Sequence, residues 1–543
     1  MLTAHAGERL GGHVVAEGLR ALGADVVFGL PGVHALPIWE GLEACGLRGL
    51  ALRQEVNAGF AADGCARVTG RPTALVVSTG PGALMALAPV MEAATAHVPL
   101  VVVSSQIAAD AIGRGLGHLH ELPDQRASFA PLVKWCGRAA SVEAIPGVLA
   151  EAWRRAGSAP QGPVYVEVPF DVLEAVATIP PVVVLDGAPP PPVVPPAELL
   201  DRAAELLTAA KRPLLWAGGG VLRAGAWVEL GELAARLDAP VATTYTGRGA
   251  FPDGDPLALG SGWDEPAHRK EVATADVVLC VGSALGYELT DNYRLRLRGT
   301  LIHVDAAPNR IGLHTAALPL VGDARATLLA LLERLPAAGP PREGQARARA
   351  VRARIADGLA AQPRSVELGL LRAVEEALPA GAVQAWDSTI LAYLAIAHLR
   401  GAEPRRFLFP AGSSTLGYAW PAALGACAAL ASVPTLAVVG DGGIQYGLSE
   451  LATARQHGLD TVLLVVDDGG YGILREYQDA AGFVHAAVDL EQPDLVAVCD
   501  AVRVPARRSA PERLADDLRW ALGLDGPAAV ILPIRLAMTQ PTP

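Results

Sequence analysis

The chain has 543 residues, of which 51% are hydrophobic and 18% are charged. This composition is typical of a well-packed globular enzyme and excludes a disordered protein, and the length exceeds one ordinary core, so about three or four domains are expected. The net charge of −12 argues against nucleic acid and anionic membrane surfaces as partners.

Six cysteines are scattered along the chain without any Cys-x-x-Cys spacing. This favours free thiols in a reducing compartment and gives no sign of a zinc site or a disulfide framework. The first residues, which include Glu8, lack the basic and then apolar pattern of a secretory signal. No stretch approaches ~18 uninterrupted apolar residues. The sequence therefore predicts a cytoplasmic protein that does not bind membranes.

In chain order, short runs rich in Val, Leu and Ile alternate with longer helical patterns in three blocks, residues 1–178, 197–335 and 364–543. Such alternation is typical of parallel sheets with helices on both faces. The sequence therefore predicts an α/β protein with three doubly wound parallel-sheet domains. Expected strands include residues 26–28, 74–78, 100–104, 213–217, 277–281 and 435–439.

Proline-rich seams separate the three blocks. Residues 180–196 hold a dense proline run, which predicts an extended linker because proline cannot pack inside a helix or a sheet. A second seam covers residues 336–363, within which residues 345–360 have a helical pattern rich in Arg and Ala.

Two acidic, glycine-rich segments mark the third block. Asp441 lies in Gly-Asp-Gly-Gly at 440–443, and Asp468 lies in Asp-Asp-Gly-Gly-Tyr-Gly at 467–472. Between them the pattern predicts a strand ending at residue 439, a helix at 448–457 and a strand at 461–466. In such a βαβ unit both aspartates reach the same sheet edge. Two carboxylates in glycine-rich turns predict an Mg²⁺ or Ca²⁺ ion that bridges a diphosphate; two ordinary turns are the alternative.

With these motifs identified, the chain resembles the thiamine-diphosphate-dependent enzymes of the acetolactate synthase, benzoylformate decarboxylase and benzaldehyde lyase group. The resemblance covers essentially the whole chain, and its motifs follow in the family order. They are Phe28-Gly29-Leu30-Pro31-Gly32, Arg53-Gln54-Glu55 with residues 61–67, Ser78-Thr79-Gly80-Pro81-Gly82, residues 162–169, residues 416–423, and the two acidic segments.

The resemblance implies a pyrimidine-binding N-terminal domain (1–178), a central Rossmann-like domain (197–335) and a diphosphate-binding C-terminal domain (364–543). It also implies thiamine diphosphate and Mg²⁺ as cofactors. In relatives the cofactor lies between subunits, so a homodimer or homotetramer is expected, with each site shared by two chains.

Catalytic and metal-binding roles also follow from the resemblance. It places Glu55 beside the cofactor's pyrimidine, where a partly desolvated carboxyl group keeps its proton available; without the resemblance, a solvated glutamate at a helix start is the simpler interpretation. It assigns the Asp441 and Asp468 carboxylates and the Gly470 carbonyl to the metal. Most relatives have Asn in place of Asp468, and the aspartate adds one negative charge beside the diphosphate.

Further cofactor contacts come from the same comparison of motifs. Leu416 resembles the aliphatic residue that keeps the two cofactor rings bent toward each other, a proximity effect; an ordinary core leucine is the alternative. The other expected contacts are Gly32, Ser388, Thr389, Ser414, Gly442, Gly443, Tyr471 and Gly472.

Three residues are candidates for substrate chemistry. His34 and His120 lie in segments that border the active site in relatives, where a histidine could move protons near neutral pH; histidines of surface loops are the alternative. Gln106 matches a family glutamine near the substrate. The central glycine run Gly218-Gly219-Gly220 could suit the diphosphate of FAD, although we expect this domain to bind no nucleotide.

The sequence thus predicts a thiamine-diphosphate- and Mg²⁺-dependent lyase that decarboxylates a small 2-oxo acid to an aldehyde, with carboligation as a side activity. An acetolactate synthase-type condensation of two 2-oxo acids is the alternative. A flavin-dependent oxidase and a catalytically idle binding protein are further alternatives.

Overall fold

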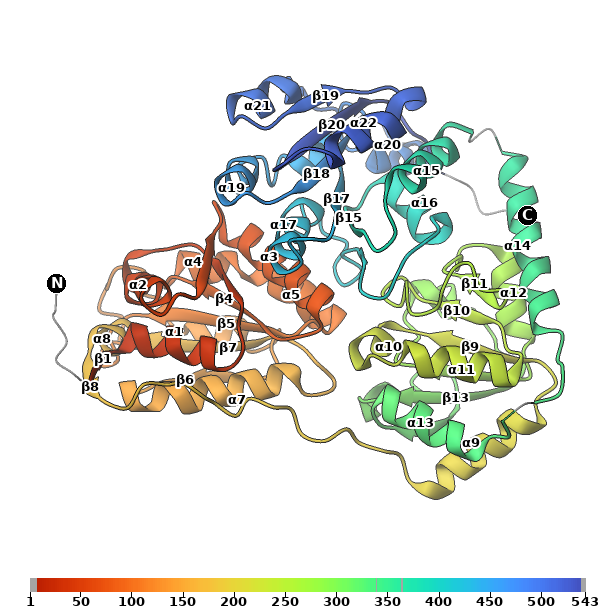
Figure 1. The fold of residues 1–543 in the computed structure, drawn as a ribbon, viewed down its shortest axis with the longest axis horizontal. Coiled ribbons are helices and arrows are strands. Elements are labelled where there is room, and N and C mark those ends of the chain that lie inside the picture. Colours follow the sequence, from red (N-terminus) through yellow and green to blue (C-terminus); the bar gives the residue numbers. More distant parts are fainter. Residues whose placement is uncertain (1–6, 338, 363–364, 539–543) are drawn as a thin grey trace.

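The computed structural model describes residues 7–337, 339–362 and 365–538. It consists of three α/β units, each built on a six-stranded parallel sheet, which confirms the predicted fold class (Figure 1). Of the predicted block boundaries, residues 1, 364 and 543 lie outside the described residues, as does residue 363 of the second seam.

The N-terminal unit has the strand order β3-β2-β4-β5-β7-β6. Alternate residues of β4 face opposite layers: Leu75 and Val77 face one core, whereas Ala74 and Val76 face the other. Burial on both faces explains the continuous apolar runs of these strands. The strands are β2 (Val26–Gly29), β3 (Arg48–Ala51), β4 (Thr73–Val77), β5 (Leu100–Gln106), β6 (Cys136–Arg138) and β7 (Val164–Pro169). The helices are α1 (Gly11–Ala21), α2 (Leu36–Cys45), α3 (Glu55–Thr69), α4 (Pro81–Met85), α5 (Leu87–Ala96), α6 (Gln125–Phe129), α7 (Ile145–Gly157) and α8 (Phe170–Glu174).

A short ribbon of β1 (Glu8–Leu10) and β8 (Val176–Thr178) closes this unit, and the proline-rich linker follows. Residues 180–196 contain no helix or strand, as predicted. The linker is tied at both ends: Val182 N–H donates to Glu17 Oε2 (3.1 Å), and Val193 C=O accepts from Asp323 N–H (2.8 Å). It crosses beneath the molecule from the N-terminal to the central unit (Figure 1, yellow).

The central unit has the strand order β11-β10-β9-β12-β13-β14. Its strands β9 (Pro213–Ala217) and β12 (Val277–Val281) have the bounds predicted from their apolar runs. The other elements are α9 (Ala197–Ala209), α10 (Gly219–Ala224), α11 (Trp227–Leu237), β10 (Val241–Thr243), β11 (Ala258–Gly260), α12 (Pro266–Thr274), β13 (Thr300–Asp305), β14 (Ala317–Val321), α13 (Ala324–Arg334) and the connecting helix α14 (Gly344–Ala360).

The C-terminal unit has the strand order β16-β15-β17-β18-β20-β19. Its strands are β15 (Val383–Trp386), β16 (Phe407–Leu408), β17 (Thr435–Gly440), β18 (Thr461–Asp467), β19 (Ala506–Arg508) and β20 (Ala528–Pro533). Its helices are α15 (Ser365–Ala377), α16 (Ile390–His398), α17 (Ala419–Ala429), α18 (Asp441–Ile444), α19 (Glu450–His457), α20 (Gly472–Ala481), α21 (Leu495–Ala501) and α22 (Leu514–Leu522).

The N-terminal and C-terminal units share one hydrophobic core, in which α3 packs directly against α17 (Figure 1). Two glycines make this approach possible. A Cβ on Gly64 would lie 2.1 Å from Ala422 O, and a Cβ on Gly425 would lie 1.8 Å from Ala61 O. The two helix backbones are therefore in contact, and no larger residue fits at either glycine.

Three arginines join the units through backbone carbonyls. Each guanidinium donates to a carbonyl oxygen in the last turn of a helix of another unit, where such oxygens lack partners within the helix. The pairs are Arg223 with Ala96 (2.9 Å), Arg405 with Thr69 (3.1 Å) and Leu222 (3.2 Å), and Arg248 with Ile396 (2.7 Å).

Within the described residues, no helix combines the length and the apolar character needed to cross a bilayer. All six cysteines are free thiols; four are buried and two, Cys45 and Cys136, are partly exposed.

Candidate active site

Asp441 and Asp468 lie at one edge of the C-terminal sheet, where the paired strands β17 and β18 end. With Gly470 they line a cavity of about 220 Å³. Both carboxylate oxygens of Asp441 are buried and have no hydrogen-bond partner among the described residues. Burial, followed by the charges of Asp468 and Asp467, raises the pKa of Asp441 to about 6. Two adjacent carboxylates, of which Asp441 has no donor, are the arrangement that a divalent cation would satisfy.

The glycines of these turns have no space for a side chain. A Cβ on Gly442 would lie 2.6 Å from the Tyr471 ring, and a Cβ on Gly472 would lie 2.0 Å from Asp468 Oδ2. Gly470 has a φ of 151°, a conformation that favours glycine. The backbone is therefore exposed to the cavity at close range. The remaining lining includes Ser388, Thr389, Ser414, Leu416, Gly443, Tyr471, Ile473 and Tyr477.

Arg475 is the cation beside this pair, and sequence reasoning missed it. Its side chain is 6% exposed and lies one turn into α20. Nη1 lies 3.1 Å from Asp468 O and 3.5 Å from Asp468 Oδ1, while Nε donates to Asp489 Oδ1 at 2.7 Å. Burial raises the pKa of Asp468, and the charge of Arg475 opposes this rise. A guanidinium thus offsets the negative charge that the aspartate at 468 adds.

Glu55 belongs to a second group of residues, in the N-terminal unit. It is the first residue of α3 and is 8% exposed, and burial raises the pKa of its carboxyl group. A Cβ on Gly82 would lie 2.9 Å from Glu55 Oε1, and a Cβ on Gly32 would lie 2.6 Å from Ser78 Oγ. The Ser78 hydroxyl is buried and has no partner among the described residues. The carboxyl group therefore lies in a glycine-lined site at the ends of β2 and β4.

His34 and His120 lie in this second group. Their ring centroids are 5.7 Å apart, and His34 stacks on Phe170 at 5.0 Å. His34 Nδ1 is 3.0 Å from Thr79 Oγ1. Burial, and then the charge of His120, lower the pKa of His34, so this imidazole is neutral at pH 7. The two rings can therefore accept a proton or pass one between polar groups.

Gln106 is the last residue of β5, and both ends of its side-chain amide are bonded within the protein. Its Nε2 donates to Glu167 Oε2 at 3.2 Å, and its Oε1 accepts from Ile107 N–H at 2.8 Å. The residue is 2% exposed. A direct substrate contact would require this amide to exchange one of its two present partners.

Within one chain, the predicted residues thus form two separate groups. The cavity beside Asp441 is lined only by residues of the C-terminal unit, and Glu55 is not among them. Where the structure is described, no three His, Cys, Asp or Glu side chains gather in a way that could hold a metal ion. A metal ion held by Asp441, Asp468 and the Gly470 carbonyl would therefore keep coordination positions open for oxygen atoms of a bound molecule.

Known proteins match all three units. Three protein-family models match this chain. Residues 9–128 match the N-terminal TPP binding domain of thiamine pyrophosphate enzymes, residues 200–331 match their central domain, and residues 390–532 match their C-terminal TPP binding domain. A probable 2-ketoarginine decarboxylase of Pseudomonas aeruginosa is 37% identical over 95% of this chain and 92% of its own length. The chain belongs to the thiamine pyrophosphate enzyme family.

Acetolactate synthases are also similar to this thiamine pyrophosphate enzyme. The enzyme of Mycobacterium bovis is 32% identical over 86% of this chain and 77% of its own length. The large subunit of isozyme 3 of Escherichia coli is 31% identical over 94% and 92%.

The residues present fit thiamine diphosphate. The orphaned Asp441 oxygens need a cation, and the turns at Gly442 and Gly472 leave backbone at the cavity, where a diphosphate could approach. Glu55 is a buried carboxyl with a raised pKa, as required of a group that exchanges a proton with an aminopyrimidine.

Asp387 is a buried acid next to the cavity-lining residue Ser388, and sequence reasoning missed it. It is fully buried directly after β15, where its oxygens accept from Ser388 N–H and Gly417 N–H, both at 2.9 Å. Burial raises its pKa to about 6. The same argument that singled out Asp441, an acid at the end of a buried strand, could have found it.

The central glycine run has a packing explanation. Gly220 N–H donates to Gly282 O at 2.9 Å, and a Cβ on Gly218 would lie 2.2 Å from the same oxygen. These glycines let the loop after β9 lie against the loop after β12. The expectation that this unit binds no FAD stays a prediction.

Proposed function

We propose that this enzyme is a thiamine-diphosphate- and Mg²⁺-dependent decarboxylase of a 2-oxo acid, with an aldehyde and CO₂ as products. The observation that carries the proposal is the buried Asp441 carboxylate, whose two oxygens have no hydrogen-bond partner among the described residues. It lies next to Asp468 and Gly470 in a cavity of a chain of this family. The whole-length similarity to a probable 2-ketoarginine decarboxylase supports decarboxylation.

In this proposal the C-terminal group holds the cofactor's charged end. Asp441, Asp468 and the Gly470 carbonyl bind Mg²⁺, and the backbone at Gly442 and Gly443 contacts the diphosphate. Ser388, Thr389, Ser414, Tyr471 and Gly472 complete the contacts, with Leu416 against the rings and Gly32 on the opposite side. When bound, thiamine diphosphate supplies the nucleophilic carbon and the electron sink that decarboxylation requires.

The N-terminal group handles protons. Glu55 would hold or release a proton beside a bound pyrimidine ring, since burial raises the pKa of its carboxyl group above that of a solvated glutamate. The ring centroids of His34 and His120 are 5.7 Å apart. We assign proton transfer with the substrate to this pair, since the lowered pKa of His34 favours the neutral imidazole that can accept a proton. Gln106 supports this region through its bond to Glu167.

We further propose that the active unit is a homodimer or a homotetramer of such dimers, in which the Glu55 group of one chain faces the Asp441 group of its partner. Exposed apolar side chains lie near both groups along the chain, and exposed apolar patches are typical of surfaces that bind another protein. They are Val33 (66%), Leu36 (53%), Leu119 (63%), Tyr477 (58%), Phe483 (68%) and Val484 (83%). The domain boundaries 1–178, 197–335 and 364–543 and the cytoplasmic location remain part of this proposal.

Acetolactate synthesis is the second candidate, supported by the similarity to acetolactate synthases. This reaction differs from simple decarboxylation because the two-carbon unit left after CO₂ departs is transferred to a second 2-oxo acid and is not released as an aldehyde. Tyr477 lines the cavity. Acetolactate synthases usually have tryptophan at the position that Tyr477 resembles, so this part of the resemblance is imperfect.

A screen of 2-oxo acids tests the proposal. The purified protein, with thiamine diphosphate and Mg²⁺, is offered pyruvate, benzoylformate, branched 2-oxo acids and 2-ketoarginine, and CO₂, aldehyde and acetolactate are measured. We expect CO₂ and aldehyde in equal amounts from at least one acid, and loss of turnover when EDTA removes the metal. Acetolactate as the main product would favour the second candidate, and turnover that needs neither thiamine diphosphate nor metal would contradict both.

A further inference from the structure

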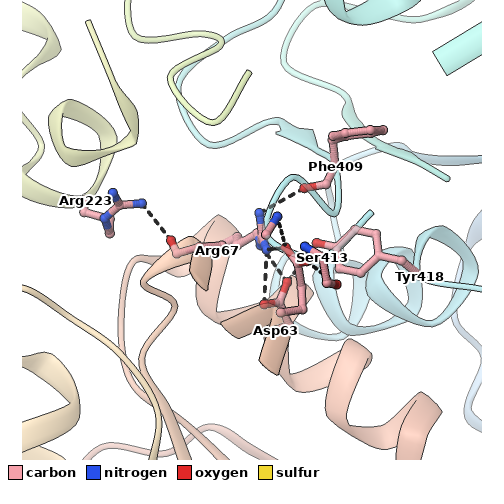
Figure 2. Close-up of polar contacts among 9 residues, drawn as sticks. Asp63, Arg67, Arg223, Phe409, Ser413 and Tyr418 are labelled. Carbon is pink, nitrogen blue, oxygen red and sulfur yellow. Dashed lines mark hydrogen bonds and ion pairs between the residues drawn. The ribbon is translucent and has the colours of Figure 1, made fainter. Parts of the chain in front are cut away.

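A buried group of charges connects the N-terminal unit to the segment that carries Ser414 and Leu416. Its members are Asp63 and Arg67 of α3 and Glu92 of α5, and both acids are fully buried. Figure 2 shows Arg67 with Asp63 on one side and with Phe409, Ser413 and Tyr418 of the C-terminal unit on the other. We call Asp63, Arg67 and Glu92 the α3–α5 charge cluster.

Arg67 uses its whole guanidinium group in this cluster. Nε lies 2.6 Å from Asp63 Oδ1, Nη2 lies 2.7 Å from Glu92 Oε1, and Nη1 donates to Phe409 O at 3.1 Å. The guanidinium also lies 5.4 Å from the centre of the Tyr418 ring. One cation thus holds two acids of its own unit and the beginning of the 409–418 segment of another.

Glu92 holds the middle of that segment. Its Oε1 accepts from Gly412 N–H at 3.1 Å, and its Oε2 accepts from Ser413 N–H at 2.7 Å and from Ser413 Oγ–H at 2.8 Å. A Cβ on Gly412 would lie only 2.9 Å from Glu92 Oε2. Charge-assisted bonds of this kind, inside a dry interface, are short and strong.

The far end of the segment is also fixed. Tyr418 Oη donates to Asp63 Oδ1 at 2.8 Å, and Gly417 N–H donates to Asp387 Oδ2 at 2.9 Å. Between these anchors lie Ser414, Thr415 and Leu416. Ser414 has a φ of 51°, a left-handed conformation that a residue with a side chain keeps only where its surroundings impose it.

We propose that the α3–α5 charge cluster is a positioning device for the cofactor segment: Arg67, Glu92 and Asp63 hold the 409–418 segment at both ends, so that Ser414 and Leu416 are presented to the cavity before any cofactor binds. The identification of Ser414 and Leu416 as cofactor contacts rests on the proposed function. The immobilisation of the segment by the cluster does not, and it can be measured on the metal-free and cofactor-free protein.

The helix α3 then serves two sites. Its first residue, Glu55, belongs to the N-terminal group, whereas Asp63 and Arg67 lie two and three turns farther along and fix the segment beside the C-terminal cavity. In the proposed dimer these are the two different cofactor sites of one pair of chains. A change in the cluster should therefore affect the cavity of its own chain without displacing Glu55.

The test compares Glu92→Gln with Glu271→Gln. Glu271 is the matched control because it is a buried carboxylate, 8% exposed, that accepts from Arg347 Nη1 at 2.9 Å in the central unit, away from the 409–418 segment. Hydrogen exchange of the cofactor-free proteins, followed by mass spectrometry, reports the segment directly. We expect amide exchange in residues 409–418 to become at least about tenfold faster in Glu92→Gln and to stay unchanged in Glu271→Gln.

Thiamine diphosphate affinity is the second measurement, by titration in the presence of Mg²⁺ without substrate. We expect Glu92→Gln to raise Kd at least about tenfold and Glu271→Gln to leave it unchanged. If Glu92→Gln does not fold, Ser413→Ala removes only the hydroxyl bond to Glu92, and we expect a smaller change in the same direction. Unchanged exchange in residues 409–418, or equal effects of the variant and its control, would overturn the proposal. If the parent protein binds no thiamine diphosphate, the proposed function fails, and the exchange measurement still decides the positioning role.

Discussion

At the scale of single residues, the Asp441–Asp468 pair is costly to the metal-free protein. Burial raises the pKa of both carboxyl groups, the charge of Asp468 raises that of Asp441 further, and a nearby cation offsets this cost. Arg475 provides that cation permanently, through its approach to Asp468 Oδ1. A bound divalent ion would add to it. Asp468 therefore has the fixed positive charge of Arg475 beside it, whereas the Asp441 oxygens remain available to a metal ion.

We predict that Arg475 and residue 468 are energetically coupled. Arg475→Met should destabilise the metal-free protein far more when residue 468 is Asp than in the Asp468→Asn background, because only the aspartate is left as an uncompensated charge. The expected coupling energy is about 1–3 kcal/mol, measured by urea unfolding of the four proteins of the double-mutant cycle. Additive effects would show that Arg475 acts through its other partners, Asp468 O, Gly469 O and Asp489 Oδ1.

At the scale of elements, the crossing of α3 and α17 depends on two glycines. Gly425 places its backbone against Ala61, and Gly64 does the same against Ala422. The contact fixes the distance between the N-terminal and C-terminal units and lies beside the α3–α5 charge cluster. Small residues are thus required here by close approach, although both positions lie inside helices where glycine is otherwise unfavourable.

We predict opposite effects for alanine at two helix-interior glycines. Gly425→Ala should lower the free energy of unfolding by about 1–3 kcal/mol, because the added methyl group overlaps the Ala61 carbonyl. Gly231→Ala in α11, where a Cβ meets nothing within 4 Å, should raise it by about 0.5–1 kcal/mol, because alanine is the better helix former. Chemical denaturation of both variants checks the pair; equal signs would contradict the packing argument.

Elements and site residues differed in how far the sequence predicted them. The runs at Pro213–Ala217 and Val277–Val281 are apolar throughout, and they form strands with the predicted bounds. β18 continues to Asp467, one residue past the predicted end, since Asp467 still pairs with Pro533. The common edge of Asp441 and Asp468 followed from the βαβ pattern. In contrast, Glu92 and Arg475 act through contacts that no local pattern encodes: Glu92 meets residues of another unit, and Arg475 turns back over its own helix start.

At the scale of the whole molecule, the two groups of site residues are each incomplete. The C-terminal cavity has no residue of the N-terminal unit in its lining, so the carboxyl group of Glu55 and the two histidines lie outside it. Exposed apolar side chains lie near both groups along the chain. A second copy of the chain would cover these surfaces and bring the two groups together.

We predict that two inactive variants restore activity when mixed. Glu55→Gln and Asp441→Ala should each lose most turnover, because each removes one half of every site. After joint refolding in equal amounts, half of the dimers should be mixed, and each of these has one intact site, so about a quarter of the parental activity should return. CO₂ release measures it. Activity that stays at the level of the separate variants would place both groups of a site in one chain.

In the contacts that join the three units, the arginine donors should tolerate substitution less well than the residues whose carbonyl oxygens accept. Arg223, Arg405 and Arg248 bind carbonyl oxygens at Ala96, Thr69, Leu222 and Ile396, and a carbonyl remains whatever side chain the acceptor carries. Substitutions at the four acceptor positions should therefore keep the units together as long as each helix ends where it does. Loss of a single guanidinium would instead leave the carbonyl oxygens of a helix terminus without that donor. In each pair, we therefore expect the acceptor residue to be free to vary and the arginine to be required.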